Sequence, residues 1–259
     1  MTAGLPDLSG HVVLVTGASG GIGAGIARRF AASGAALVLG HRADTGTGAV
    51  RAAGLAAELT AAGGRALTAA ADITDGAACA RLVALAGERF GRLDAVVGCA
   101  GVQSVVELSE MSDAEWQRVV AANLTGAFHT VQAAAATLRD TGGSITMIAS
   151  VEGRRPARGH AHYASAKAGV IMLARAAAVE YGTAGIRVNS VSPGLVDRLG
   201  LADQWPDGLR RWQQAAPLGR VGAAAEIGDA CVFLASPMAA FITGHDLVVD
   251  GGMSAVAGW

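Results

Sequence analysis

The chain has no run of 18 uncharged apolar residues, so the sequence predicts no helix that spans a membrane. Its first ten residues, MTAGLPDLSG, lack the basic start and the apolar core of a signal peptide. An excess of one charge is also missing, because 20 basic and 21 acidic side chains leave a net charge of −1. This balance gives no electrostatic reason to bind nucleic acid or an anionic membrane, so we expect a small-molecule partner.

Cysteine is scarce, and its three positions form no pattern. Cys79, Cys99 and Cys231 are scattered without the spacing of metal ligands. An odd number of such thiols suits reduced cysteines in a cytoplasmic protein. We therefore expect no disulfide, no metal site and a cytoplasmic location.

Apolar residues and glycine are abundant instead. Of 259 residues 52% are hydrophobic, and 37 are glycine. Short β-branched runs alternate with helical patterns along the whole length, without an internal repeat or a linker. This alternation predicts a single α/β domain with a sizeable core.

The first such unit predicts a phosphate site. His11–Thr16 reads as a buried strand, the glycine-rich turn Gly17–Gly23 follows, and Ile22–Ala32 has a helical pattern. Free N–H groups at a helix start attract anions, and glycines let the backbone approach a pyrophosphate closely. We expect this turn to bind a nucleotide cofactor.

The end of the second strand, Ala36–Gly40, bears on which nucleotide is bound. An NAD-binding chain would place an acidic residue here to bind the ribose 2′-hydroxyl, but His41 and Arg42 follow the strand instead. The planar guanidinium of Arg42 suits a 2′-phosphate, which favours NADP(H) over NAD. A solvated arginine after a strand is the alternative.

Two later strand ends carry candidate cofactor contacts. Asp72 and Ile73 follow a strand near Arg65–Ala71, where the carboxylate could cap the next helix or accept from an adenine amino group. Strand Leu93–Val97 ends in the small residues of 98–101, which would let a cofactor lie flat. A simple turn is the alternative for this second site.

Asn123 stands inside the predicted helix Ser112–Arg139. Asparagine is a poor helix former, so its position predicts either a kink or a task for its amide. Strand Ser144–Ala149 then places Ser150 at the carboxyl edge of the sheet, where open α/β sheets hold their ligands.

Tyr163 and Lys167 form the central pair. Residues four apart share one helix face, so the phenol and the ammonium can reach one point. A lysine about 4–6 Å away supplies roughly 3–4 kcal/mol, nearly enough to bring a tyrosine pKa toward neutrality. The pair therefore predicts proton transfer, although a packed ring beside a solvated amine has the same spacing.

The last third of the chain completes a seven-stranded sheet. Strand Gly185–Val191 leads into Ser192-Pro193-Gly194, and a final helix, Glu226–Leu234, precedes strand Asp246–Val249. Between them, 195–219 is the least regular region and could close over a substrate. Its tryptophans could equally belong to the core or to subunit contacts.

Taken together, these residues make the chain resemble the single-domain short-chain dehydrogenases/reductases over nearly its full length. The resemblance implies a Rossmann-type, doubly wound, seven-stranded parallel sheet with helices on both faces. The matching positions are TGxxxGxG at Thr16–Gly23, the adenine-contact acid Asp72, Ala100-Gly101, the helix residue Asn123, the trio Ser150, Tyr163 and Lys167, and the turn Pro193-Gly194.

The resemblance also implies roles. Tyr163 would protonate a carbonyl oxygen that Ser150 binds, while Lys167 holds the nicotinamide ribose and Asn123 supports a water chain that restores the proton. The implied cofactor contacts are Gly17, Ser19, Gly21, Ile22, Gly23, His41, Arg42, Asp72, Ile73, Ala100, Gly101, Tyr163, Lys167, Pro193, Gly194 and Val196.

The chain departs from the family pattern at three places. Gly98 and Cys99 replace two asparagines, which weakens a structural hydrogen-bond site. Arg198 stands where many members carry a threonine for the cofactor carboxamide. His41 and Arg42 replace the acidic residue of NAD users.

Within the family the chain is similar to ketoreductases of aromatic polyketides, especially angucycline 6-ketoreductases, through GHAHYASAKAG, VSPGLVDR and GHDLVVDGG. This similarity implies a polycyclic ketone as substrate. The expected substrate contacts are Ser150, Glu152, Tyr163, Ser192, Trp205 and Trp212, with Ser192 selecting the ketone face.

Three other functions compete. A 3-oxoacyl-carrier-protein reductase would use a basic patch such as Arg154, Arg155 and Arg158 to bind its acidic partner. A sugar or polyol dehydrogenase and an NADP sensor without turnover are the others. Relatives often form tetramers, so we expect a homotetramer through the apolar helix Ala164–Tyr181 and the C-terminal strand with its Trp259 tail.

Overall fold

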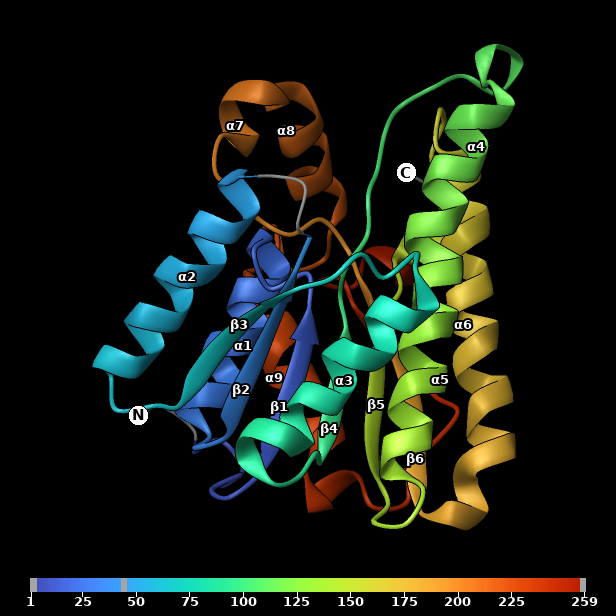
Figure 1. Cartoon of the computed structure of the whole chain (residues 1–259). Coiled ribbons are helices and arrows are strands. Elements are labelled where there is room, and N and C mark those ends of the chain that lie inside the picture. The colour runs from blue at the N-terminus through green and yellow to red at the C-terminus, as the bar shows by residue number, and fades with distance from the viewer. Residues whose placement is uncertain (1–3, 43–45, 257–259) are drawn as a thin grey trace.

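The computed structural model describes residues 4–42 and 46–256, which form one parallel sheet flanked by helices. Its seven strands lie in the order β3-β2-β1-β4-β5-β6-β7, so the strand order reverses beside β1, between β1 and β4 (Figure 1). This arrangement confirms the predicted Rossmann-type sheet. The strands are β1 Val12–Thr16, β2 Ala36–His41, β3 Ala66–Ala70, β4 Ala95–Gly98, β5 Gly143–Ile148, β6 Ile186–Pro193 and β7 Asp246–Val249.

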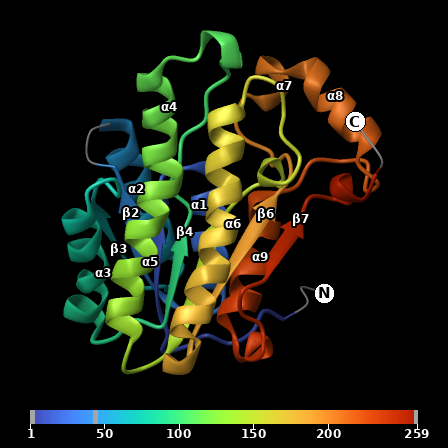
Figure 2. The same ribbon diagram turned by 90° about the vertical axis from the view of Figure 1, so that its right-hand side faces the viewer.

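Helices cover both faces of the sheet. Helices α1, α2 and α9 pack on one face, and α3, α5 and α6 pack on the other, with α4 continuing α5 upward (Figures 1 and 2). The helices are α1 Gly21–Ala32, α2 Gly46–Ala61, α3 Gly76–Phe90, α4 Asp113–Val120, α5 Gly126–Leu138, α6 Ala161–Tyr181, α7 Leu201–Gln204, α8 Pro206–Ala215 and α9 Ala224–Ala235.

The core explains why the strands read as continuous apolar runs. Alternate residues of β1 point to opposite faces: Leu14 packs beside α3 and α5, whereas Val13 and Val15 pack beside α1 and α9. Every residue of β1 and β2 is buried. Both faces of the central strands are therefore dry, as a parallel sheet requires.

Element boundaries agree with the sequence to within a few residues. The predicted helix Ser112–Arg139 is present as α4 and α5, joined by the π-helical turn Ala121–Thr125. Helix α6 begins three residues earlier than expected, and Tyr163 therefore lies in its first turn. The Trp259 tail lies outside the described residues.

The region expected to be irregular contains two short helices. Within 195–219, α7 and α8 lie above the carboxyl ends of the strands (Figure 1). Pro206 begins α8, where its fixed φ and missing N–H cost nothing. The segment thus contains more helix than its sequence suggests, and its role as a lid stays a prediction.

Candidate active site

The turn after β1 is shaped by glycines that have no room for a side chain. Gly17 has φ +69°, and a Cβ there would lie 2.7 Å from the Cα of Ala100. Helix α1 follows with Gly20 at its N-cap and no side chain bonded to the first turn. A Cβ on Gly21 would meet nothing within 4 Å, so the helix start is open to an anion.

Three further residues of this turn differ in how deeply they are buried. Gly23 is buried against the Gly17 carbonyl, and Ile22 packs partly into the core below α1. Ser19 remains partly exposed beside them. The turn therefore combines a rigid floor with an accessible surface of backbone.

At the end of β2, His41 and Arg42 take different positions. His41 is buried, and its Nδ1 lies 3.2 Å from the Arg42 carbonyl oxygen. Arg42 is exposed. Its charge contributes to lowering the pKa of Asp72, although hydrogen bonds from Thr74 are the larger cause. Arg42 and Asp72 thus approach each other across neighbouring strand ends.

Asp72 does not cap the next helix. The Asp75 carboxylate caps α3 by accepting from the backbone N–H groups of Ala77 and Ala78 at 2.8 and 3.3 Å. Asp72 instead accepts from the N–H and hydroxyl of Thr74 at 2.9 and 2.8 Å. The capping alternative for Asp72 was wrong.

The small residues after β4 form a floor beside the glycine turn. Thr16 Oγ1 accepts from the backbone N–H groups of Cys99 and Ala100 at 3.1 and 3.3 Å. A Cβ on Gly101 would collide with Asn123 Oδ1. The side-chain hydrogen bonds at this turn are thus made by Thr16 on β1. The family pattern would instead place two asparagines at Gly98 and Cys99.

Asn123 occupies the π-helical turn, and its amide binds two carbonyl groups. Its Nδ2 donates to the carbonyl oxygens of Val102 and Val119 at 2.7 and 2.9 Å. Its Oδ1 is buried and, among the described residues, has no hydrogen-bond partner. Asn123 therefore both lies in an irregular helical turn and uses its amide nitrogen in hydrogen bonds. Its amide oxygen remains as an acceptor near Gly101.

Ser150, Tyr163 and Lys167 meet beside this acceptor. The Ser150 hydroxyl, at the end of β5, accepts from the Glu152 N–H at 3.1 Å and is hydrogen-bonded to Tyr163. Lys167 Nζ lies 5.5 Å from the centroid of the Tyr163 ring and donates to the Ile148 carbonyl oxygen at 2.8 Å. Both side chains project from one face of α6, as their spacing predicts.

Burial dominates the electrostatics of this group. Burial and the nearby Glu152 charge raise the pKa of Tyr163, and the Ser150 hydrogen bond opposes them. Burial likewise lowers the pKa of Lys167 to about 8. We expected Lys167 to be nearly enough to bring the pKa of Tyr163 toward neutrality, but in this structure burial raises that pKa, because the site disfavours both charged forms.

Comparison with known proteins agrees with this geometry. Residues 17–254 match the family described as Enoyl-(Acyl carrier protein) reductase. The 2,5-dichloro-2,5-cyclohexadiene-1,4-diol dehydrogenase LinX from Sphingobium indicum is 39% identical over 248 residues, covering 95% of this chain and 97% of LinX. The cis-4-hydroxycyclohexanecarboxylate dehydrogenase from Sinomonas cyclohexanicum has the same identity and coverage.

The solved structures point the same way. A crystal structure from Sinorhizobium meliloti 1021, designated a short-chain alcohol dehydrogenase, superposes with a TM-score of 0.90 at 36% identity. The match covers 97% of this chain and 99% of that one. The chain belongs to the short-chain dehydrogenase/reductase family. It is an oxidoreductase of alcohols or ketones, and its family uses nicotinamide nucleotides.

The family's turn near the nicotinamide is present after β6. Pro193 ends the strand, and the Gly194 N–H donates to the Val249 carbonyl oxygen at 3.0 Å. A Cβ on Gly194 would lie 2.7 Å from the Trp212 ring, and Val196 is buried in a bridge to Gly222. The turn is therefore tightly packed below α8.

Of the expected substrate residues, Ser192 is misplaced. It is fully buried, and its hydroxyl donates to Asp246 Oδ1 at 2.8 Å, beside the equivalent bond from Ser190 at 2.7 Å. The other oxygen of Asp246 accepts from Arg154 Nε at 2.9 Å. Ser192 belongs to a buried polar cluster between strands and does not line a pocket, so that expectation was wrong.

The two lid tryptophans differ. Trp212 is buried in a small cluster with Val151, Ala216 and Met253, which makes it a core residue. Trp205, between α7 and α8, is 46% exposed. Of the two, only Trp205 thus has a large exposed surface.

Arg198, also in this segment, is exposed and donates to Gln204 Oε1 at 2.6 Å.

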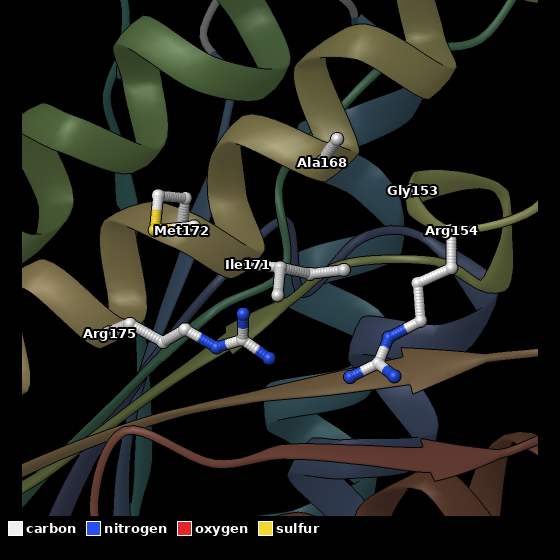
Figure 3. Close-up of a pocket in the computed structure, with 6 residues that line it drawn as sticks. All are labelled: Gly153, Arg154, Ala168, Ile171, Met172 and Arg175. Carbon is white, nitrogen blue, oxygen red and sulfur yellow. The ribbon is translucent and has the colours of Figure 1, made fainter.

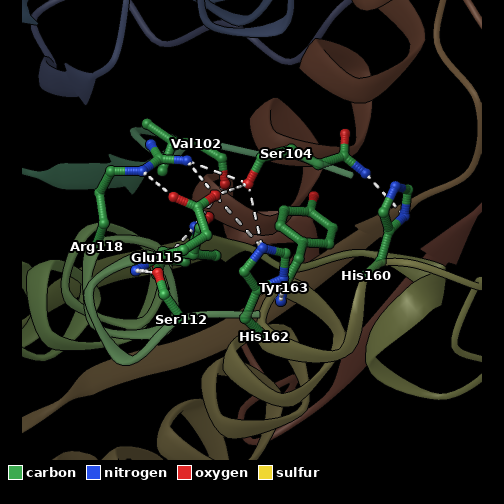
Figure 4. A network of polar contacts seen from close by, with 11 residues as sticks. Val102, Ser104, Ser112, Glu115, Arg118, His160, His162 and Tyr163 are labelled. Atoms are coloured by element: carbon green, nitrogen blue, oxygen red, sulfur yellow. Dashed lines mark hydrogen bonds and ion pairs between the residues drawn. The ribbon is translucent and has the colours of Figure 1, made fainter. Parts of the chain in front are cut away.

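A polar network that sequence reasoning missed surrounds the first turn of α6 (Figure 4). The buried His162 accepts the Tyr163 N–H on Nδ1 at 2.9 Å, and its Nε2 lies 3.1 Å from Ser104 Oγ. Ser104 also bonds to Glu115 and to Arg118. No short motif marks these contacts, because they join a loop and two helices that are distant in sequence.

A hollow of about 320 Å³ lies against α6 but not at these groups (Figure 3). Its lining includes Arg154, Ile171, Met172 and Arg175. Met172 follows Tyr163 by nine residues, and at 100° per residue it points to the opposite side of the helix. None of Ser150, Tyr163 and Lys167 is among the residues that line this hollow.

Other expected absences can be examined within residues 4–42 and 46–256. In these ranges no three metal-ligating side chains gather, and the three cysteines are free thiols. No described helix is long and apolar enough to cross a membrane.

Proposed function

We propose that the protein is an NADPH-dependent ketoreductase that acts on a ring ketone of a polycyclic aromatic polyketide of the angucycline type. The observation that carries the catalytic part is the convergence of Ser150, Tyr163 and Lys167 at the carboxyl edge, beside the free Asn123 oxygen. These groups can bind a carbonyl oxygen and deliver a proton to it.

The residues at this edge fit a dinucleotide. Gly21 leaves no Cβ between the backbone of the turn and a ligand, and the start of α1 has no side-chain cap to compete with a pyrophosphate. Asp72 would bind the adenine end, while Lys167 and the Pro193-Gly194 turn would hold the nicotinamide end. The bound cofactor supplies the hydride.

The side chains would then manage the proton. Tyr163 keeps its proton at neutral pH, because burial raises its pKa, and so it is ready to act as a general acid. Ser150 donates a hydrogen bond to the same carbonyl oxygen. Lys167 and the buried Asn123 Oδ1 line the path by which water restores the proton to Tyr163.

Arg42 supports NADPH rather than NADH. Its exposed guanidinium stands at the end of β2, where an acidic residue would bind an unphosphorylated ribose. A charged hydrogen bond is worth about 1.5–3 kcal/mol, so Arg42→Ala should raise KM for NADPH roughly 10- to 100-fold. KM for NADH should change little, and equal effects on both would reject this assignment.

The ring ketone is supported by the relatives and by the arginines near the site. Both relatives are named for alcohols on six-membered carbon rings. The carrier-protein alternative needs unpaired arginines, but Arg154 is paired with Asp246 and the exposed Arg158 with Glu107. Arg155 donates to the Val256 carbonyl oxygen at 2.7 Å.

A homotetramer is supported by apolar side chains on the outer surface of α5 and α6. Phe128, Met172 and Val179 are exposed there, Val179 to 83%. Burying such side chains is the usual source of association free energy. Light scattering at micromolar concentration should give the tetramer mass, and a monomer mass would contradict this assignment.

The first experiment is NADPH oxidation with a polycyclic angucycline-type ketone, a simple β-ketoacyl thioester and a sugar ketone, each also run with NADH. Preference for the polycycle with NADPH is the expected result. Preference for the thioester would transfer the function to carrier-bound chemistry. Cofactor binding without turnover of any substrate would indicate a sensor.

A further inference from the structure

A carboxylate–imidazole pair flanks the catalytic group. Glu152 follows Ser150 by two residues, and His160 precedes Tyr163 by three. His160 Nδ1 lies 2.8 Å from Glu152 Oε2, and the rings of His160 and Tyr163 are edge to face with centroids 6.3 Å apart. The pair is thus next to the phenol but makes no hydrogen bond to it.

The pair leaves one nitrogen available. The hydrogen bond to Glu152 raises the pKa of His160 and commits Nδ1. No described residue forms a hydrogen bond with Nε2 of this ring. Each side chain is 15% exposed, so the pair is nearly buried yet reaches the surface. An imidazole oriented by a carboxylate on one nitrogen can form a hydrogen bond with a ligand through the other, accepting when neutral and donating when protonated.

A third polar side chain joins the pair from the segment after β4. Gln103 Nε2 lies 3.2 Å from His160 Nδ1 and 3.4 Å from Glu152 Oε1. Gln103 is the next residue after Val102 and precedes Ser104, and both of these lie in the network around Tyr163 (Figure 4). The three polar groups therefore form one cluster.

Both neighbours of Gln103 are fixed. The Val102 carbonyl accepts from Asn123, and the Ser104 hydroxyl is held by His162, Glu115 and Arg118 (Figure 4). Support of this kind keeps a side chain in one orientation, which recognition requires. The segment is braced on both sides of the residue that contacts the pair.

We propose that His160, Glu152 and Gln103 recognise a phenolic hydroxyl on the ring system that carries the reacting ketone. This inference rests on the proposed ring-ketone reduction. The hydroxyl would form a hydrogen bond with His160 Nε2, donating to the neutral ring or accepting from the protonated one, while Ser150 and Tyr163 bind the carbonyl oxygen. A ring without the hydroxyl would leave this polar nitrogen without a partner in the complex, and such a ketone should therefore bind more weakly.

The test compares α-tetralone with phenolic α-tetralones whose hydroxyl lies too far from the carbonyl to bond to it. Wild-type enzyme should prefer at least one phenolic ketone by roughly tenfold or more in kcat/KM. In His160→Phe, which keeps an aromatic ring against Tyr163, that preference should fall to about twofold or less. Activity on α-tetralone itself should stay within about threefold of wild type.

Two variants complete the design. Glu152→Gln keeps a hydrogen-bond acceptor for Nδ1 but removes the charge, so part of the preference should remain. Arg158→Ala changes an exposed neighbour and should leave the preference unchanged. An equal loss for all ketones in His160→Phe would mean that the ring only supports the fold, and would overturn the proposal, as would the absence of any preference in wild type.

A binding measurement separates this inference from the proposed function. If no tetralone is reduced with either cofactor, ring-ketone reduction is rejected, and the same compounds are then titrated by quenching of tryptophan fluorescence. Tighter binding of a phenolic compound, lost in His160→Phe, would still support the recognition site. Equal binding of phenolic and parent compounds, or no binding, would overturn it.

Discussion

The carboxyl edge of the sheet is built in two different ways. After β1 the edge consists of backbone, with glycines that exclude side chains and a helix start without a cap. After β5 it consists of buried polar side chains, among them Ser150, Asn123 and Lys167, each less than 9% exposed. The first half suits the nucleotide that we propose as cofactor, whereas the second half holds the side chains to which we assign the chemistry.

The difference lies in what burial does to each half. Backbone N–H groups keep their polarity whatever surrounds them, so the glycine turn works through shape. Burial changes the protonation of side chains, raising the pKa of Tyr163 and lowering that of Lys167 to about 8. Substitutions that change a functional group should therefore have their main effect in the catalytic half. Substitutions that add side-chain volume should have their main effect in the nucleotide half.

Tyr163→Phe tests the catalytic half with the largest expected effect. The change removes one hydroxyl from a packed ring, so the fold and cofactor binding should persist. Turnover should fall about 10²–10⁴-fold, because the general acid is lost. Steady-state kinetics and NADPH fluorescence titration measure the two quantities, and full activity in the variant would remove Tyr163 from the reaction.

Gly17→Ala tests the nucleotide half. The residue would have to adopt a left-handed conformation and place a Cβ 2.7 Å from the Ala100 backbone. Left-handed backbone and overpacking together should lower the free energy of unfolding by about 2–4 kcal/mol. Urea unfolding without cofactor measures this loss.

Gly21→Ala is the matched control in the same turn. A Cβ there meets nothing in the protein, and Gly21 begins α1, so the unfolding free energy should be unchanged or rise by up to about 1 kcal/mol. NADPH should nevertheless bind more weakly, because the Cβ would project toward a pyrophosphate. Equal destabilisation by both substitutions would contradict the assignment of Gly17 to the packed floor of the turn and of Gly21 to the surface that contacts the ligand.

This contrast also explains what could be predicted from the sequence. The glycine turn, Asn123 and the Tyr163–Lys167 spacing depend on local rules, so their placement and the sheet they imply could be read directly. The network of His162, Ser104 and Glu115 could not, because its members are brought together only by packing. Ser192 was misjudged for the same reason: a position at a strand end does not reveal which side chains cover it.

The pKa of Tyr163 shows the same limit. Spacing along a helix gives the approach of Lys167, and from that approach alone the phenol should become more acidic. Burial depends on the whole fold and acts in the opposite direction, as does the Glu152 charge. Local spacing thus gives the partners of a titrating group but not the sign of the net shift.

Lys167→Met sharpens the comparison through stability. Lys167 is the chain's single lysine, and its pKa falls from 10.5 unfolded to about 8 folded, so burying the ammonium costs about 3 kcal/mol below pH 8. Lys167→Met removes this cost but also loses the hydrogen bond to the Ile148 carbonyl oxygen, which offsets part of the gain. The cofactor-free variant should therefore be about 1–2 kcal/mol more stable than wild type at pH 7. Urea unfolding checks this gain.

The pH dependence provides the control for that gain. Below pH 8 both states of wild type hold the lysine proton, and the full cost is present. Between pH 8 and 10.5 the unfolded state binds more protons, so wild-type stability should rise with pH relative to the variant. Parallel stability curves for the two proteins across this interval would show that Lys167 is not buried as a charge.

Ser192→Ala has the smallest expected effect on activity and probes the boundary between the halves. Loss of its bond to Asp246 should cost about 1–2 kcal/mol of unfolding free energy, since Ser190 and Arg154 still hold the carboxylate. Ser190→Ala, which removes a bond to the same oxygen deeper in the sheet, is the matched control. If both serines are purely structural, the two variants should lose similar stability and keep kcat/KM within about twofold. A change in activity or in product stereochemistry with Ser192→Ala alone would mean that this buried residue still controls the pocket through Asp246.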